Sequence, residues 1–341
     1  MIGFEDLNII SWNVRGALHE NGRLFVRDLI RAQKVDMVLL FETRCQFAQV
    51  SRFWSTLGFA PKFIQEAQGF SGGIWVLIRT IANFSCRLLH MHNQAVSFEI
   101  WRDNLSWACS AIYASPIPTQ RENLWEHLCH IRGSITIPWL LVGDMNETLL
   151  PSEVRGGEFM ARRAAKFAEV LAQCNLVDLG LVGGRYTWFR KRNNRIILSK
   201  KLDRGLGDVD WRMAFPEATI EILHRLHSDH CPLLVHCGNS SVVGEGTRLF
   251  RFMAAWADHP GYQQVVQGAW QREEGPIHSK LDRVRIASEK FNKETFGGIF
   301  RRKRWVEGRL RGVQLDLSMR VTSSMAQLES ELQLEYKSIL K

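Results

Sequence analysis

The sequence Leu226-His227-Ser228-Asp229-His230-Cys231-Pro232-Leu233-Leu234-Val235 joins a polar triplet to an apolar run. The apolar half is typical of a strand that is buried on both faces. Such a strand would hold a hydroxyl, a carboxylate and an imidazole together just before its N-terminal end. We therefore expect Ser228, Asp229 and His230 to lie side by side at a functional site.

Three earlier apolar runs also end in polar residues, which are Asn13, Glu42 and the pair Asp144/Asn146. If the backbone is extended there, Asp144 and Asn146 point to the same side, because they lie two residues apart. Four polar sites at strand ends predict one pocket along the rim of a sheet.

Helical spacing alternates with these strands. Helices are expected over residues 23–34, 121–132 and 163–174, and a hairpin pairs residues 95–101 with 105–113. Strands and helices in mixed order, with several hairpins, favour an α+β fold over a doubly wound sheet.

The chain of 341 residues is basic, with 44 Lys and Arg against 35 Asp and Glu, a net charge of +9. This favours an anionic partner, which could be nucleic acid, a phosphorylated small molecule or an acidic membrane, over a merely soluble basic protein. Seven cysteines without a Cys-x-x-Cys pair indicate a reducing compartment and no zinc site. No signal peptide is evident, and no apolar run approaches about 20 residues, so no membrane span is expected.

The core domain is predicted to cover residues 1–237, followed by a small, polar linker at 238–250 and a helical region at 251–341. Apolar residues recur every three or four positions from Leu310 to Ile339, which predicts one long helix that packs on a partner or a neighbouring domain. The pattern runs to Lys341 without a helix cap, so the chain is expected to be cut short.

Glu42 and Asp229 offer hard oxygen ligands of the kind that Mg²⁺ and Mn²⁺ prefer. Asp144 could take a proton from water while the Asn146 amide donates to a phosphoryl oxygen, which suits phosphoester hydrolysis. His230 could share a proton with a phosphate oxygen if Asp203 fixes its tautomer. Solvated strand-end acids, an Asp-x-Asn turn and a structural histidine are the alternatives.

A basic hairpin tip is predicted to contact phosphates, although a solvated turn has the same pattern. Its residues are Arg190, Lys191, Arg192 and Arg195. Thr187 and Trp188 precede this tip, where they could also reach DNA.

Six short motifs stand in the order typical of one superfamily: SWN (11–13), ET (42–43), IY (112–113), GDMN (143–146), LDR (202–204) and SDHCP (228–232). Over residues 7–236 the chain resembles the endonuclease/exonuclease/phosphatase superfamily, the fold of deoxyribonuclease I and the apurinic/apyrimidinic endonucleases. The stretches SWNVRG, GGRYTWFRKR and RLFRFMAAWADHP most resemble the endonuclease domain and connector of plant LINE-type (non-LTR) retrotransposon polyproteins. Residues 281–341 resemble the segment before the reverse transcriptase, which is absent.

The resemblance implies a four-layer α/β sandwich, in which two packed mixed sheets are flanked by helices, followed by a helical C-terminal extension. It implies the following roles: metal binding by Asn13, Glu42 and Asp229, water activation by Asp144, phosphate contacts by Asn146 and Tyr113, and charge stabilisation by His230 oriented by Asp203. Thr187 and Ser228 would join the basic tip in contacting DNA. Arg15 replaces an acid of the apurinic/apyrimidinic endonucleases, which argues against abasic-site repair, and Met145 replaces the usual Phe.

The expected function is a Mg²⁺-dependent (or Mn²⁺-dependent) DNA endonuclease that nicks one strand and leaves a 3′-hydroxyl to prime reverse transcription. A reverse transcriptase domain or another protein could bind through the C-terminal helix. Genomic DNA as substrate implies an intracellular, nuclear location. The alternatives are a phosphatase of the same superfamily and an inactive relic that still binds nucleic acid.

Overall fold

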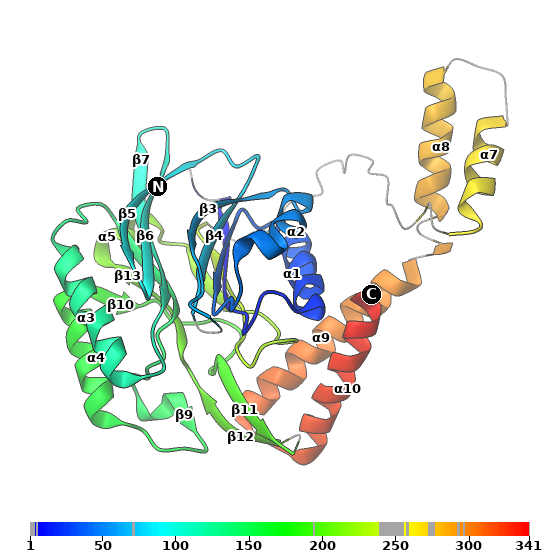
Figure 1. The fold of residues 1–341 in the computed structure, drawn as a ribbon. Coiled ribbons are helices and arrows are strands. Elements are labelled where there is room, and N and C mark those ends of the chain that lie inside the picture. The colour runs from blue at the N-terminus through cyan, green and yellow to red at the C-terminus, as the bar shows by residue number, and fades with distance from the viewer. Residues whose placement is uncertain are drawn as a thin grey trace. The chain divides into compact units, whose positions relative to one another are not determined.

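Two six-stranded mixed sheets pack face to face in a computed structural model of the chain (Figure 1). The structure describes residues 4, 6–69, 72–193, 195–238, 256, 259–271, 277–291, 294–295 and 297–340. Contacts within the chain define two compact units, one of residues 1–240 with 310–341 and one of residues 241–309. The sheets belong to the first unit.

The first sheet is built around the parallel pair β1 and β2, which α1 (Glu20–Gln33) connects. Its order is β14 (Thr219–Ile222), β15 (Leu233–His236), β1 (Asn8–Asn13), β2 (Met37–Phe41), β4 (Ile74–Arg79) and β3 (Phe59–Gln65). Every residue of β2 is buried, as its uninterrupted apolar sequence predicts. α1 buries Phe25 and Leu29 toward the sheet and ends at Lys34, which adopts a left-handed conformation.

The second sheet contains the other parallel pair, β7 and β8, which α3 (Pro118–Arg132) connects. Its order is β10 (Leu176–Asp178), β13 (Asp203–Asp208), β8 (Trp139–Asp144), β7 (Leu105–Tyr113), β6 (Ala95–Arg102) and β5 (Ser85–His92). A small third sheet has the order β11 (Trp188–Arg192), β12 (Arg195–Lys200) and β9 (Val154–Arg155).

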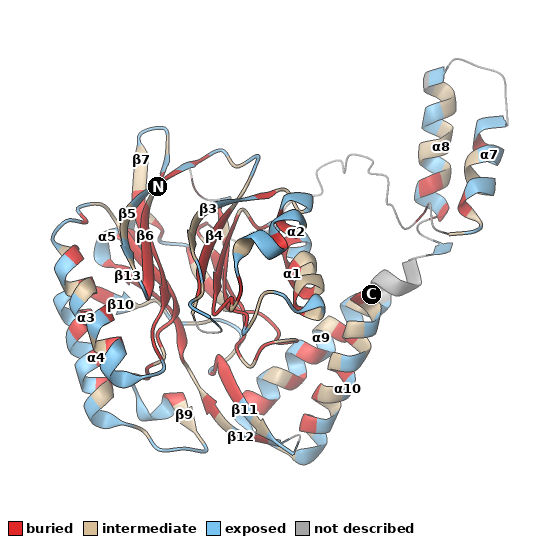
Figure 2. Ribbon diagram, viewed as in Figure 1, coloured by how far each residue is buried: buried red, intermediate tan, exposed pale blue. Residues whose placement is uncertain are grey.

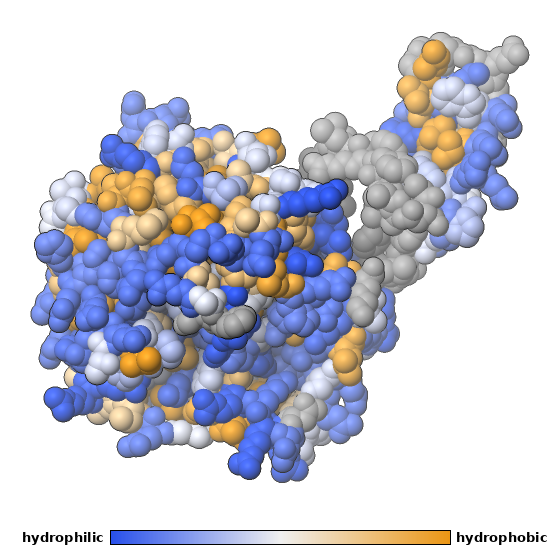
Figure 3. All heavy atoms as spheres, viewed as in Figure 1, coloured by the Kyte–Doolittle hydropathy of each residue, from blue (hydrophilic) through white to orange (hydrophobic). Residues whose placement is uncertain are grey.

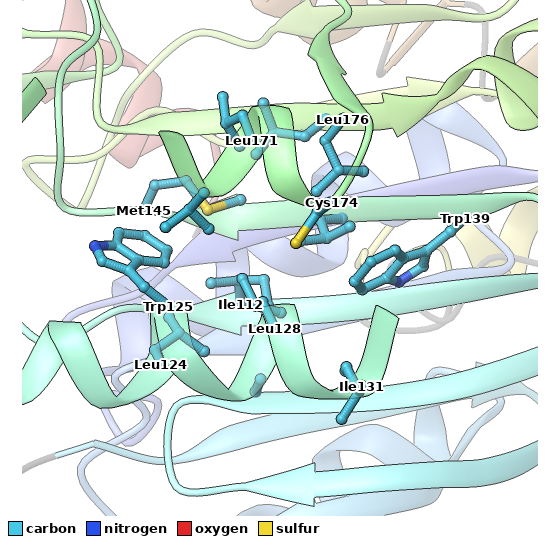
Figure 4. Close-up of a cluster of buried hydrophobic side chains, with 14 of the residues drawn as sticks. Ile112, Leu124, Trp125, Leu128, Ile131, Trp139, Met145, Leu171, Cys174 and Leu176 are labelled. Carbon is cyan, nitrogen blue, oxygen red and sulfur yellow. The ribbon is translucent and has the colours of Figure 1, made fainter. Parts of the chain in front are cut away.

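Helices cover the outer faces of both sheets, α1 and α2 (Ser51–Thr56) on the first and α3 and α4 (Ala161–Gln173) on the second (Figure 1). Trp125 of α3 stacks on Phe167 of α4 at 4.7 Å between ring centroids, in a cluster that also buries Met145 (Figure 4). The strands are largely buried and the outer helix faces exposed (Figure 2), and hydrophilic residues cover much of the visible surface (Figure 3). The predicted fold class, two packed mixed sheets flanked by helices, is confirmed.

The predicted single long helix after residue 310 is two helices, α9 (Gly297–Met319) and α10 (Ser323–Leu340), separated at residues 320–322. Their apolar stripe is buried within the first unit, with Leu317 and Tyr336 nearly inaccessible. The Tyr336 hydroxyl donates to Asp28 of α1, and Arg27 donates to the carbonyl of Leu340 at 3.2 Å. The stripe therefore packs on the chain's own sandwich rather than on a separate partner.

In the second unit, α7 (Tyr262–Gln271) and α8 (Ile277–Phe291) pack around Trp256, Tyr262 and Phe291. The Tyr262 hydroxyl lies 2.8 Å from the Ser288 hydroxyl. The predicted linker at 238–250 lies outside the described residues, apart from Gly238, and the predicted division into domains remains a prediction. Among the described residues, no helix is both long and apolar enough to cross a membrane.

Candidate active site

Asp144, the last residue of β8, lies at the centre of the predicted site and is 1% exposed. The sheet register pairs it with Tyr113 at the end of parallel β7 and with Asp203 at the start of antiparallel β13. Three neighbouring strands of the second sheet therefore bring these predicted residues side by side.

The side-chain amide of Asn13 connects this group to the first sheet. Its Nδ2 donates to Glu42 Oε2 and to Asp144 Oδ2, each at 3.0 Å. Asn13 ends β1, and Glu42 follows β2, its parallel neighbour. The predicted pocket at the rim of one sheet is thus corrected: its residues come from the facing ends of two sheets.

The Ser228–His230 triplet is fixed by hydrogen bonds on both sides. Ser228 Oγ donates to the carbonyl of Asn13 at 2.7 Å and accepts the backbone N–H of His230 at 3.1 Å. His230 Nδ1 lies 2.9 Å from Asp203 Oδ2, and its Nε2 lies 3.7 Å from Asp144 Oδ2. The structure therefore brings together the His230–Asp203 pair that the sequence proposed, with Asp144 on the other side of the ring.

Burial and charge set the protonation of this pair. Burial raises the pKa of Asp144 to about 6, with the nearby Asp203 carboxylate adding to the rise and His230 opposing it. Burial lowers the pKa of His230, but Asp203 and Asp144 outweigh it and raise that pKa to about 9. Near neutral pH the site thus holds an ionised Asp144 beside an imidazolium, a base and an acid within hydrogen-bonding reach of one water or phosphate.

Asn146 was predicted to point to the same side as Asp144 if the backbone there is extended, but its backbone is not extended. Its φ is +48°, in the left-handed region, and its N–H donates to Asp144 Oδ1 at 2.9 Å. The side-chain Nδ2 donates to the carbonyl of Ala114 at 2.8 Å and to Asp144 Oδ2 at 3.2 Å. A turn, not a strand, therefore holds this amide beside the central carboxylate.

Two arginines contact the acidic residues that were predicted to bind metal. Arg44 donates to Glu42 Oε1 at 3.0 Å through Nε, and Arg15 Nη1 lies 3.4 Å from the same oxygen. Arg15 also donates to both carboxylate oxygens of Asp229, at 2.9 and 3.1 Å, and Trp188 Nε1 donates to Asp229 at 2.8 Å. Sequence reasoning assigned no role to Arg44, although it follows Glu42 by two residues.

The backbone at this edge is strained. Arg15, Glu42 and Arg44 have φ of +53°, +54° and +54°, values that non-glycine residues rarely adopt. Such conformations cluster at functional sites, where the surrounding structure offsets a cost of about 1–3 kcal/mol each. The strain is an independent sign of function at Glu42.

The basic hairpin, formed by β11, β12 and the turn between them, exposes Arg190, Arg192 and Arg195. Lys191 points elsewhere and pairs with the buried Glu329 of α10 at 2.8 Å.

Thr187 and Ser228, predicted to contact DNA, are instead buried. Thr187 Oγ1 accepts the N–H groups of Leu202 and Asp203 at 3.0 and 2.9 Å. Like Ser228, whose hydroxyl bonds the backbone of Asn13 and His230, Thr187 has no surface to offer DNA and serves to position its neighbours.

The oxygen donors at this site fit a hard divalent cation. Among the described residues, Asp144, Asp203 and His230 form the one group of three acidic, histidine or cysteine side chains whose ligand atoms all lie within 4.8 Å of one another. The predicted ligands Glu42 and Asn13 lie directly beside this group, because the Asn13 amide bonds both Glu42 and Asp144. The two ligand sets therefore border a single acidic centre.

Comparison with known proteins identifies the family. The chain belongs to the endonuclease/exonuclease/phosphatase family, whose model matches residues 10–230. No curated protein is significantly similar to the chain in sequence.

Several solved structures share the fold. The AP endonuclease LMAP from Leishmania major has a TM-score of 0.53 at 15% identity, covering 67% of this chain and 86% of its own. The endonuclease domain of TRAS1, a telomere-specific non-LTR retrotransposon, also has a TM-score of 0.53 at 15% identity, covering 70% of this chain and 100% of its own. The 3′ phosphatase NExo from Neisseria, bound to a product DNA hairpin, has a TM-score of 0.51 at 18% identity, covering 67% and 98%. At these identities the likeness establishes the fold.

Proposed function

We propose that this chain is a metal-dependent DNA endonuclease that hydrolyses a phosphodiester and leaves a 3′-hydroxyl for target-primed reverse transcription. It would be a fragment of a LINE-type retrotransposon polyprotein, of the plant kind. The observation that carries the proposal is the buried Asp144, which lies between the Asn13–Glu42 pair and the His230–Asp203 pair. The fold shared with the TRAS1 endonuclease domain supports it.

Asn13, Glu42 and Asp229 would hold Mg²⁺ or Mn²⁺, with Arg15 and Arg44 releasing their carboxylates as the cation binds. The bound cation would supply charge stabilisation at a phosphoryl oxygen and would lower the pKa of water.

The chain's own residues would then divide the chemistry. Asp144 would take the proton from the attacking water, since a carboxylate whose pKa is about 6 is ionised at neutral pH but still basic enough to accept a proton. Tyr113 would donate to the scissile phosphate, and so would Asn146, by exchanging its 3.2 Å hydrogen bond to Asp144 Oδ2 for one to a phosphoryl oxygen. The His230 imidazolium, held by Asp203, would neutralise charge as the phosphorus gains its fifth oxygen. The P–O3′ bond would then break, and the leaving 3′-oxygen would take a proton from solvent to give the 3′-hydroxyl.

Exposed arginines of the basic hairpin would contact DNA phosphates, while Lys191 ties the hairpin to α10. The buried apolar stripe already packs on the sandwich, so it is not free to bind a partner. A reverse transcriptase domain or another protein would instead bind the outer side of α10, where Leu334 is 68% exposed. Action on genomic DNA would place the protein in the nucleus.

A defined duplex oligonucleotide labelled on one strand tests the proposal. We expect an internal cut that a DNA polymerase can extend without prior phosphatase treatment, and no such cut by Asp144→Asn. Release of inorganic phosphate from a 3′-phosphorylated strand without internal cutting would instead identify a phosphatase. DNA binding without either product would identify an inactive relic. A matched abasic duplex should be cut no faster, because Arg15 occupies the acid position of the abasic-site enzymes.

A further inference from the structure

A polar cavity of about 320 Å³ opens beside the catalytic residues, on the side of Tyr113. Its walls come from both sheets. Gln65 ends β3, and Glu66, Gln68 and Gly72–Gly73 lie between β3 and β4, whereas Asn93 and Gln94 form the turn between β5 and β6. Its volume lies near the lower end of the range of about 300–1,000 Å³ typical of small-ligand sites. The cavity can therefore hold one small planar group.

Backbone hydrogen bonds fix this cavity to the catalytic strand ends. The Glu42 N–H donates to the carbonyl of Gly73 at 3.0 Å, and the Arg44 N–H donates to that of Gly72 at 3.3 Å. On the opposite wall, the Ala114 N–H donates to the carbonyl of Asp144 at 2.8 Å. A phosphate at Asp144 would thus place one of its flanking nucleotides at the mouth of the cavity.

Among the residues that the structure describes, the lining is rich in amides and includes no Lys or Arg. It contains Gln65, Gln68, Asn93, Gln94 and Gln120, and Glu66 is its one charged residue within that described part. A phosphate is disfavoured here, because Glu66 would repel it and no Lys or Arg would bind it. Amide side chains instead match the hydrogen-bonding edges of nucleobases, and the rings of Tyr113 and Pro116 add apolar surface for a base to rest on.

Of these five amides, two are structural and two are exposed, and the fifth, Gln65, has a buried Oε1 without a hydrogen-bond partner among the described residues. Gln94 Nε2 donates to the carbonyl of Gln120 at 2.8 Å, and Gln120 Oε1 accepts the Ser115 hydroxyl at 2.9 Å, so these side chains stiffen one wall. The side chains of Gln68 and Asn93 are exposed at the mouth, one from each sheet. A base that enters the cavity would meet both.

We propose that this cavity is a nucleobase subsite, in which Gln68 and Asn93 read the edge of the base next to the scissile phosphate. The inference rests on the proposed endonuclease function and adds to it a source of sequence preference. An amide that makes two hydrogen bonds to a base discriminates against other bases by about tenfold or more.

The test maps nicks in a plasmid that carries a randomised stretch, by sequencing the 3′ ends made by the wild type, Gln68→Ala and Asn93→Ala. Asn104→Ala is the matched control, because Asn104 is also an exposed amide and lies in the turn at the other end of β6. We expect the wild type to favour particular bases at a position flanking the cut. In each variant, the ratio of cuts at preferred bases to cuts at other bases should fall by about tenfold. The control should keep both the preference and the wild-type rate of nicking on mixed-sequence plasmid.

A wild type that cuts without preference at the flanking positions would overturn the subsite, as would variants that keep the wild-type preference. A wild type that cuts no DNA would overturn the proposed function itself. Circular dichroism of each variant separates loss of preference from loss of fold.

Discussion

Replacing Asp203 with Asn should convert His230 from an imidazolium into a mostly neutral ring at neutral pH. The substitution keeps the size of the side chain and removes the charge that lies 2.9 Å from Nδ1. In the native site the pKa of His230 rises from 6.5 to about 9 although burial opposes the rise, and Asp203 is the largest of the charges that raise it. That rise corresponds to about 3 kcal/mol in favour of the charged ring.

We expect Asp203→Asn to slow nicking at pH 7.5 by about 100-fold or more, the usual range for a misplaced acid–base group. The pH profile is the sharper assay. Wild-type nicking should rise as Asp144 ionises near pH 6 and fall as His230 loses its proton near pH 9, with both limbs belonging to the interacting pair. In Asp203→Asn the alkaline limb should move toward neutral pH.

Asp210→Asn is the matched control, because it removes the same charge from an exposed residue in the first turn of α5 (Val209–Ala214). It should keep the wild-type rate and profile. An unchanged alkaline limb in Asp203→Asn, with the control behaving as expected, would refute the role of the Asp203–His230 pair.

Three further perturbations follow from the same structure. Gly143→Ala should unfold the protein or lower its melting temperature sharply, because a Cβ there would lie 2.0 Å from the Ile112 carbonyl oxygen at a φ of +146°. Thermal melts would measure the loss, with Gly133→Ala as the control, because a Cβ at Gly133 meets nothing within 4 Å. Glu329→Ala should lower the free energy of unfolding in urea by about 3–5 kcal/mol, because it leaves two cationic side chains, one of them buried, without their carboxylate partner. A loss under about 1 kcal/mol would contradict this. Changing the three exposed arginines of the basic hairpin to Ala in an Asp144→Asn background should weaken DNA binding. The slope of the log binding constant against log salt concentration should become shallower by about 2–3. An unchanged slope would exclude the hairpin from the interface.

Uninterrupted apolar runs made much of the core predictable from sequence. β2 and β8 are buried on both faces, so their residues are apolar without alternation, and the polar residues at their ends could be predicted to share a site. β3 and β5 were not predicted, because Pro61 interrupts one and exposed or half-exposed residues dominate the other. Local patterns favoured an α+β fold, and the short motifs in a fixed order added the four-layer sandwich through the resemblance that they carry.

The geometry of the site depended on contacts that no local pattern contains. Packing of β1 against β8, which belong to different sheets, decides that Asn13 meets Asp144. Pairing of β8 with β13 places Asp203 beside Asp144, where His230 reaches both. The left-handed turn at Asn146 and the burial of Thr187 likewise result from packing. The same holds for the C-terminal stripe, since periodicity predicts an apolar helix face but not which surface covers it.

Nicking itself can be measured as relaxation of supercoiled plasmid by the full chain, with and without Mg²⁺, and with Asp144→Asn run in parallel. Open circles should form only when both Mg²⁺ and the Asp144 carboxylate are present, because that carboxylate is proposed as the base that activates water. Equal relaxation by Asp144→Asn, or by the wild type in EDTA, would contradict the assignment of this site. No relaxation at all, with DNA binding intact, would contradict the endonuclease.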